Sequence, residues 1–336
     1  MEYTQIIKEV TKEILSEEIH YVSLKNKLET LNSTLLNITK IDVNNLDDRE
    51  DIQFENGIAL CPTFAALCVV DLMRTRQFIR GVFKAVKEVR SQKNTPVKVF
   101  YAGTGPFATL ILPLLTKYSP QELQLTLLEV NEKTGEYLKS TIKELEIESY
   151  IEKIISEDAS KYKIAKTQEV DILISETMQH GLVKEQQVPI MLNLVNQLSK
   201  DVIIIPNNIK LDLALVNTKD EFVLNDDLES RYKFLKTVLE FDKRFIHNHS
   251  NQTSNSNRFQ LCKQLQFLEE GDDEEYDKLA ILTSIQVYDD EWIHSDSCSL
   301  TVPRSLLNIE RIEKGKKKIS LDYTIKNLPD FEYKLN

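Results

Sequence analysis

The sequence has few cysteines and no long apolar run. Its four cysteines, Cys61, Cys68, Cys262 and Cys298, are scattered, with no C-x-x-C pair and no cluster of histidines nearby. We therefore expect reduced thiols, with neither disulfides nor a zinc site. No segment reaches the ~18 apolar residues that a membrane-spanning helix needs, and the glutamate-rich start resembles no targeting peptide. These absences predict a cytoplasmic protein with no metal site and no membrane partner.

The sequence also has fewer basic than acidic residues. The chain has 42 Lys and Arg against 53 Asp and Glu, a formal net charge of −11. The only dense basic stretch is the short run Lys314–Lys318. A nucleic-acid-binding surface would need a concentrated basic patch to overcome this negative field. We therefore expect no nucleic-acid partner, while the acidic balance is compatible with a cationic substrate.

The first two thirds of the chain change from helical patterns to alternating ones. Residues 1–47 look helical, with a break near Asn32 and Ser33, and a long helical pattern covers residues 62–89. After Pro96, β-rich runs alternate with helical ones. The expected strands are 97–103, 123–130, 150–156, 170–176 and 201–206, and the expected helices are 109–118, 135–147 and 188–199. This alternation predicts an α/β fold with a Rossmann-like, mostly parallel sheet.

Beyond about Asn207 the pattern becomes mostly β. Strands are expected at 209–216, 279–290, 299–303 and 319–327, with a helix at 228–239 and a polar loop at 247–257. The prediction is a helical N-terminal segment (1–60), a Rossmann-like domain (61–210) and a mostly β C-terminal domain (211–336).

Glycine is scarce, and two of the 8 glycines stand together directly after the first expected strand. Gly103, Thr104 and Gly105 could let the backbone approach a ligand at the start of a helix. A tight turn without a ligand explains the pair about as well. The third glycine of the dinucleotide fingerprint is missing, since Phe107 or Ala108 stands in its place. This weakens the case for a pyrophosphate cofactor such as NAD.

Acidic residues follow the next three expected strands. Glu129 ends the second strand, where a carboxylate can accept hydrogen bonds from ribose hydroxyls. Asp158 and Ala159 follow the third strand, where a nucleobase edge could be recognised. Glu176 ends the fourth strand. Any one of these acids could be a solvated surface carboxylate, but parallel strands end at one edge of a sheet. Together they predict a nucleotide-type ligand site.

Four segments carry a resemblance to a known family: ALCVVDLMRTRQF, VFYAGTGPF, LTLLEVN and VDILISETMQHGLVKE. Residues 96–216 resemble the S-adenosylmethionine-binding core of class I methyltransferases, most closely the protein arginine methyltransferases. The resemblance implies S-adenosylmethionine as cofactor. It also implies methyl transfer to a nitrogen, less often an oxygen, of a peptide, protein or small metabolite. A homodimer is compatible with the sequence.

The resemblance also implies roles for individual residues. Glu176 and Glu185 correspond to the family's double-glutamate loop and would orient the acceptor, although Glu185 could simply start the next helix. His180 on the same loop is a candidate general base for another acceptor. Arg74 would bind the cofactor's carboxylate. The expected cofactor-binding residues are Arg74, Tyr101, Gly103, Thr104, Gly105, Glu129, Asp158, Ala159 and Glu176.

Two alternatives stay open at this point. The chain could be a non-catalytic scaffold with a methyltransferase-like fold, or an NAD-type oxidoreductase. The family's Thr-His-Trp loop is absent, and its nearest candidates are Trp292 and His294 in a different context.

Overall fold

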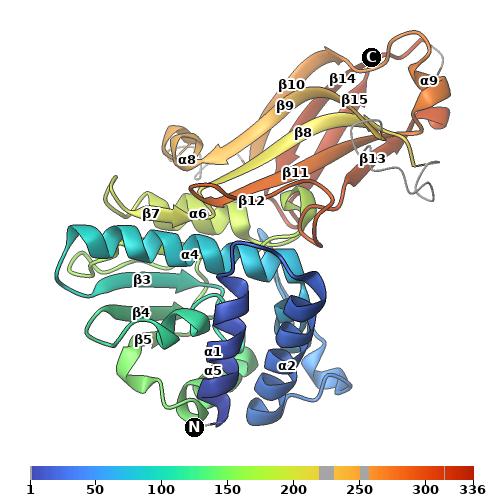
Figure 1. Ribbon diagram of the computed structural model, residues 1–336. Helices are drawn as coiled ribbons and strands as arrows, with labels where there is room; N and C mark the ends of the chain where they lie inside the picture. Colours follow the sequence, from blue (N-terminus) through green and yellow to red (C-terminus); the bar gives the residue numbers. More distant parts are fainter. Residues whose placement is uncertain (1, 219–230, 250–256, 314) are drawn as a thin grey trace.

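The computed structural model describes residues 2–218, 231–249, 257–313 and 315–336. A parallel sheet with its helices forms one lobe, and antiparallel strands form a second, upper lobe (Figure 1). Part of the expected helix at 228–239 and most of the expected polar loop at 247–257 lie outside the described residues. The division of the chain into segments 1–60, 61–210 and 211–336 stays a prediction.

The parallel sheet has the strand order β5-β4-β3-β6-β7, and every neighbouring pair is parallel. Its strands are β3 (Val97–Ala102), β4 (Leu123–Leu128), β5 (Ile151–Ile155), β6 (Ile172–Ser175) and β7 (Ile203–Ile205). The predicted α/β class with a mostly parallel sheet is confirmed. The chain runs from β3 outward to β5 and then returns to β6, so the strand order reverses beside β3. In such sheets, ligands bind at this reversal, beyond the carboxyl ends of the strands.

The expected helix at 109–118 is wrong. The segment forms turns and then a 3-10 helix, η3 (Leu112–Thr116), because Pro113 stands within it and Ala108 adopts a φ of 47°. Proline cannot donate to a helical ladder, and a left-handed residue interrupts one. Helix α1 (Glu2–Ile14) packs against η3.

Helix α2 (Tyr21–Thr39) is continuous through Asn32, so the expected break there is wrong. The chain turns between α1 and α2 instead. Leucines at helical spacing, Leu24, Leu28, Leu31 and Leu35, are buried along one face of α2, which packs against α5 (Glu132–Glu144). Burial of that face stabilises the helix across the polar residues. A short hairpin then follows, β1 (Ile52–Phe54) and β2 (Gly57–Ala59).

The single helix expected at 62–89 is interrupted. It consists of α3 (Pro62–Leu67), a 3-10 turn and α4 (Leu72–Gln92), because Asp71 leaves the helical region with φ −73° and ψ 97°. Helix α4 lies between the parallel sheet and the upper lobe (Figure 1) and contacts strands of both. It thereby fixes the two lobes relative to each other.

In the upper lobe, one antiparallel sheet has the path β12-β11-β8-β9, with β13 paired to β11, and the other has the order β10-β14-β15. The strands are β8 (Asn208–Val216), β9 (Tyr232–Asp242), β10 (Arg258–Gln266), β11 (Lys278–Tyr288), β12 (Glu291–Ile293), β13 (Arg304–Asn308), β14 (Lys318–Thr324) and β15 (Asp330–Leu335). The remaining α-helices within the described ranges are α6 (Gln187–Val195), α8 (Lys243–His249) and α9 (Asp272–Glu275). The helix expected at 228–239 is wrong where described, since pairing with β8 makes this segment strand β9. The strand expected at 299–303 is a turn.

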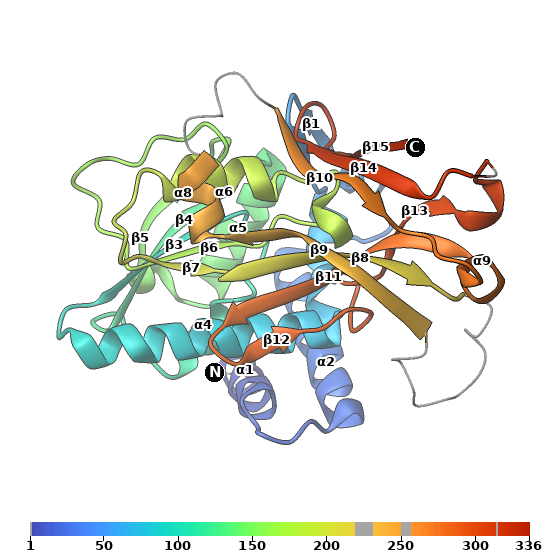
Figure 2. The same ribbon diagram turned by 90° about the horizontal axis from the view of Figure 1, so that it is seen from above.

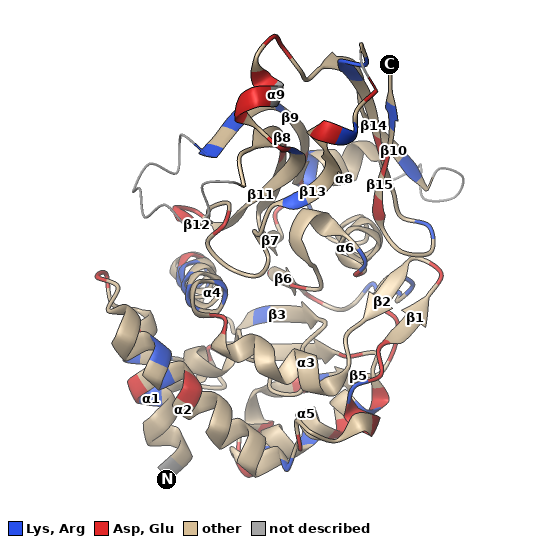
Figure 3. Ribbon diagram, turned by 90° about the vertical axis from the view of Figure 1, so that its right-hand side faces the viewer, with Lys and Arg blue, Asp and Glu red and all other residues tan. Residues whose placement is uncertain are grey.

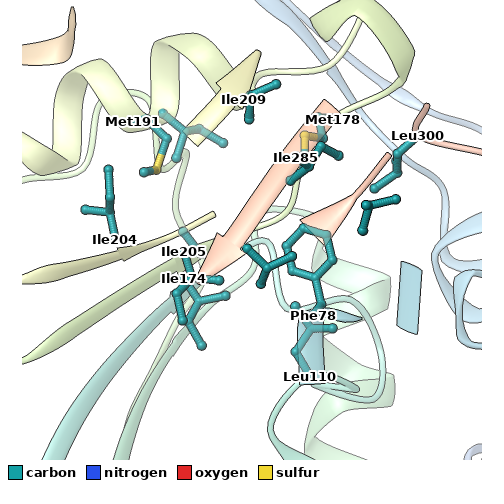
Figure 4. Close-up of a cluster of buried hydrophobic side chains, with 14 of the residues drawn as sticks. Phe78, Leu110, Ile174, Met178, Met191, Ile204, Ile205, Ile209, Ile285 and Leu300 are labelled. Atoms are coloured by element: carbon teal, nitrogen blue, oxygen red, sulfur yellow. The ribbon is translucent and has the colours of Figure 1, made fainter. Parts of the chain in front are cut away.

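Buried side chains of both lobes meet in one core. Phe78 on α4 and Ile174 on β6 lie near Ile285 on β11 and Leu300 of the upper lobe (Figure 4). Burying such a side chain stabilises a protein by about 1.5–3 kcal/mol. The two lobes therefore share one continuous hydrophobic core.

A buried charge network joins the same parts. The Arg80 Nε lies 2.9 and 3.0 Å from the two carboxylate oxygens of Glu291 on β12. Arg76 and Arg80 also donate to the carbonyl of Ser16, just beyond α1, at 2.7 and 2.9 Å. Outside this buried network, basic and acidic residues are mixed along helices α1, α2 and α4 (Figure 3). No helix in the described part of the chain is long and apolar enough to cross a membrane, and a cytoplasmic location stays a prediction.

Candidate functional site

A pocket of about 920 Å³, counting its opening to solvent, lies at the carboxyl ends of the parallel strands. The expected site residues that line it are Arg74, Tyr101, Gly103, Thr104, Gly105, Glu129, Ala159, Glu176 and Glu185. They come from α4, from the ends of β3, β4 and β6, and from two loops. The fold therefore brings together most of the residues singled out in the sequence.

The two glycines of the turn after β3 differ in their surroundings. Both adopt left-handed conformations, with φ of 74° at Gly103 and 62° at Gly105. A Cβ at Gly103 would collide with the side chain of Thr177. At Gly105 the nearest atom to such a Cβ is the Ala65 Cβ, 3.8 Å away. Gly103 is thus required by the packing of the protein itself, whereas Gly105 leaves space that belongs to the pocket.

Glu129 is tied to the glycine turn. Its carboxylate accepts the backbone N–H of Gly105 and that of Asn131, both at 2.9 Å. Burial raises the pKa of Glu129, and these backbone donors oppose the shift. Each carboxylate oxygen can accept more than one hydrogen bond. The arrangement can therefore hold the turn and still accept hydroxyl groups of a ribose.

Arg74, in the first turn of α4, is paired with Glu176 at the end of β6. Its Nε lies 3.1 Å from the Glu176 Oε2, and its Nη2 contacts the same oxygen. The side chains are 12% and 7% exposed. Burial opposes the charge on Arg74, but Glu176 outweighs it and raises the pKa of the guanidinium. An arginine has five N–H donors, so this pairing leaves donors for a ligand carboxylate.

Glu185 brings a second buried carboxyl group to the pocket. Burial, together with the charge of Glu176, raises the pKa of Glu185 to about 8. The charge of Arg74 and a hydrogen bond from Gln179 offset part of that shift. The Glu176 Oε1 is buried and has no hydrogen-bond partner among the described residues. When Glu185 is ionised, two carboxylates beside the single guanidinium of Arg74 attract a further cation, and a planar guanidinium can donate to both.

Two neutral groups also line the pocket. Burial raises the pKa of the Tyr101 hydroxyl far above its usual range. It also raises the pKa of the Cys68 thiol to about 11. Both groups are therefore protonated at neutral pH. Sequence reasoning missed Cys68 as a pocket residue. It also missed Ile58, Ala59 and Leu60 of the β2 segment, because three-residue strands leave no periodic pattern.

Some expected residues lie outside the pocket lining. The Asp158 carboxylate accepts the backbone N–H of Ser160 at 2.8 Å, and only its neighbour Ala159 reaches the pocket. His180 is half-buried in the 3-10 turn η5 (His180–Leu182). Burial and the charge of Arg304 lower its pKa. His294 is exposed, with its ring stacked 6.2 Å from that of Trp292.

Comparison with known proteins gives the site its class. Residues 70–204 match the family model described as PRMT5 arginine-N-methyltransferase. No curated protein sequence matches. The solved structure described as PRMT6-SAH is 12% identical, and the match covers 80% of this chain and 98% of that one, with a TM-score of 0.51. A second PRMT6 structure is 11% identical, with 76% and 96% covered and a TM-score of 0.50.

At such identities the solved structures support the fold, and the family model supports the chemistry. The predicted resemblance to the arginine methyltransferases and the methyltransferase class are confirmed, and the PRMT6-SAH structure shares the fold. The methyltransferase class argues against the two alternatives, a non-catalytic scaffold and an NAD-type oxidoreductase. The matched segment contains Arg74, the glycine turn, Glu129, Glu176 and Glu185.

Proposed function

We propose that this chain, an S-adenosylmethionine-dependent methyltransferase similar to the arginine methyltransferases, methylates a guanidinium nitrogen of a peptide or protein. The observation that carries the proposal is the pair of buried carboxyl side chains, Glu176 and Glu185, in one pocket with the glycine turn. A buried carboxylate without a full set of partners is costly. A cationic acceptor would supply the missing donors.

The cofactor would occupy the side of the pocket formed by the glycine turn and β4. Gly105 leaves room for close approach, Glu129 would accept hydrogen bonds from the ribose hydroxyls, and Arg74 would bind the carboxylate. Ala159 would line the base, with Asp158 supporting its loop. When bound, the cofactor supplies a methyl group activated by a positively charged sulfur.

The chain's own contribution is to place the acceptor nitrogen. Methyl transfer is an in-line displacement, so most of the rate enhancement comes from position and alignment. Glu176 and Glu185 would grip the two arms of the guanidinium and leave one nitrogen directed at the methyl group. Methylation of a guanidinium releases one proton. Glu185, which binds the acceptor in its ionised form and whose pKa burial raises, can accept that proton.

His180 has no place in this proposal as a catalytic base, because it does not line the pocket. An oxygen acceptor would need such a base. A peptide or protein acceptor is preferred to a small metabolite because the pocket is open to solvent. A homodimer stays a prediction that light scattering of the purified protein can test.

The test replaces Glu176 and Glu185 by Gln, one at a time, and follows methyl transfer from labelled S-adenosylmethionine to arginine-containing peptides. Gln keeps the volume and removes the charge. Turnover should fall at least about a hundredfold in each variant, the usual contribution of a positioned acid or base. S-adenosylhomocysteine affinity should change little for Glu185→Gln.

The matched control is Glu157→Gln, which changes an exposed acid near the same edge of the sheet. It should leave turnover and affinity as they are. Normal turnover in both pocket variants would overturn the acceptor role of the two glutamates. Normal turnover in Glu185→Gln alone would point to an acceptor held by Glu176.

A further inference from the structure

We infer that the upper lobe positions Glu185. Tyr323 and the turn between β14 and β15 hold the loop that carries this residue. This loop, residues 179–186, is called the Glu185 loop below. The inference rests on the role proposed above for Glu185 and adds positioning residues that lie far away in the sequence.

The Glu185 loop has an unfavourable backbone. Gly181, Leu182 and Lys184 adopt φ angles of 68°, 58° and 65°. Left-handed conformations cost little for glycine but are disfavoured for residues with a Cβ. Such conformations persist only where the surroundings determine them, and they cluster at functional sites. The loop therefore needs contacts from outside itself to direct Glu185 into the pocket.

Those contacts reach each of the left-handed residues. The Tyr323 hydroxyl donates to the Leu182 carbonyl at 2.6 Å. The Lys184 N–H donates to the Pro329 carbonyl at 2.7 Å. The Gly181 N–H donates to the Thr283 hydroxyl at 2.9 Å. These three partners lie on β14, on the turn 325–329 and on β11, which all belong to the upper lobe.

Tyr323 is well suited to this task because its ring cannot move freely. It is 1% exposed. Its ring packs edge-on against Phe331, with centroids 5.6 Å apart, and stacks against Phe259, with centroids 6.4 Å apart. A buried hydroxyl keeps its hydrogen bond because an unpaired one is costly. The direction of this bond is thus set by the aromatic packing of the upper lobe.

The hairpin β1–β2 holds the loop from the other side. The Ile58 N–H donates to the Lys184 carbonyl at 2.9 Å, and the Gln186 amide donates to the Asn56 Oδ1 at 2.6 Å. A Cβ at Gly57, where φ is 137°, would lie 2.9 Å from the Lys184 carbonyl oxygen. The loop therefore lies between the hairpin and the upper lobe, and Asn56 of the hairpin pairs with Asn327 of the turn after β14. In the view of Figure 2, β1 accordingly overlaps the end of β14 nearest this turn.

Glu185 directly follows these restrained residues, so its orientation depends on them. Loss of the Tyr323 bond would let Leu182 and Lys184 relax, and the carboxyl group would move. The glycine turn and Glu129 lie on another wall of the pocket and do not contact Tyr323. Tyr323 should therefore affect methyl transfer much more than cofactor binding.

The experiment compares Tyr323→Phe with Tyr333→Phe, a matched control on β15 that is 45% exposed. Amide hydrogen exchange is measured first, since it needs no acceptor. The amides of Gly181 and Lys184 should exchange at least about tenfold faster in Tyr323→Phe. Gly103 and Gly105 should be unchanged, and the control should match the wild type throughout. Unchanged exchange at Gly181 and Lys184 would overturn the inference.

Turnover with arginine-containing peptides is the second measurement. Tyr323→Phe should lower kcat at least about tenfold with little change in S-adenosylhomocysteine affinity. In a Glu185→Gln background it should cause no further loss, since both act through one group. Normal kcat in Tyr323→Phe, with Glu185→Gln inactive, would overturn the positioning role. An active Glu185→Gln variant would instead overturn the proposed function, and hydrogen exchange would still decide what holds the loop.

Gly57→Ala tests the same loop from the hairpin side, in case Tyr323→Phe folds poorly. The added Cβ must displace the Lys184 carbonyl or the Gln186 side chain. It should also speed exchange at Lys184 and lower kcat. Cofactor affinity equal to the wild type will show that the variant is folded.

Discussion

At the scale of single residues, the raised pKa of Glu185 has a consequence for stability. Its value of about 8 in the folded protein exceeds the usual carboxyl value of 4.5. Between these two values the folded state binds more protons than the unfolded state. Stability therefore falls as pH rises from about 5 to about 8. Each unit of pKa shift corresponds to about 1.4 kcal/mol, so this decline amounts to several kcal/mol.

Glu185→Gln should remove much of that decline, because glutamine does not ionise. Denaturant unfolding at pH 5.5 and pH 8, without ligand, measures it. Burial also raises the pKa values of Glu129 and Glu176, so part of the slope should persist in the variant. A slope equal to that of the wild type would mean that Glu185 is ionised in the folded protein at pH 5.5.

The same group predicts a pH dependence of catalysis. Only ionised Glu185 attracts a cationic acceptor, and kcat/KM reports the free enzyme. The value of kcat/KM should therefore rise with pH up to about 8 and then level off. In Glu185→Gln this rise should disappear together with most of the activity. A flat profile in the wild type would contradict an acceptor bound by the ionised form.

Glu129 offers a test of the cofactor site. Glu129→Gln removes the charge and places an amide group against the N–H groups of Gly105 and Asn131. Hydrogen bonds to charged groups contribute about 1.5–3 kcal/mol, so S-adenosylhomocysteine affinity should fall about tenfold to a hundredfold. Calorimetry measures it, with Glu132→Gln, in the first turn of α5, as the control. Equal affinity in the variant would remove Glu129 from the cofactor site.

At the scale of elements, the sequence predicted the parallel strands well because each is a short β-rich run that alternates with a helical segment or a turn. Their ends also meet at one edge by a general rule, which brought the glycine turn, Glu129 and Glu176 within reach of inference. Arg74 followed from the family resemblance instead. The helix expected at 109–118 failed because apolar spacing was given more weight than Pro113, which cannot donate to a helical ladder. The left-handed φ of Ala108 left no mark in the local pattern. The hairpin at 52–59 and the hydrogen bond from Tyr323 depend on distant partners, so no local pattern could reveal them.

The junction of α4, β12 and the Ser16 carbonyl leads to a prediction about stability. Glu291 is buried against Arg80 and also contacts Lys84 at 2.7 Å. Removing one partner of a buried pair costs about 3–5 kcal/mol because the other charge remains buried. Glu291→Gln should therefore destabilise the fold strongly in denaturant unfolding, with cofactor affinity retained. Glu29→Gln, at a surface pair with Lys25, should cost at most about 1 kcal/mol.

At the scale of the whole molecule, cofactor binding should be visible as stability. A ligand at about 100 times its Kd stabilises the folded state by about 2.7 kcal/mol. S-adenosylmethionine and S-adenosylhomocysteine should both raise Tm in a melting scan, whereas NAD should not. A larger shift with NAD would contradict the site described here.

The sequence distance between Tyr323 and Leu182, 141 residues, orders the events of folding. The glycine turn, Glu129 and Arg74 all lie within residues 74–129, so their side of the pocket needs no contact from the upper lobe. The Glu185 loop gains its restraint only after β14 has been synthesised and has paired in the upper lobe, since contacts of high sequence separation form late and slowly. A nascent chain should thus acquire the cofactor side of its pocket before the carboxyl group that receives the acceptor is fixed.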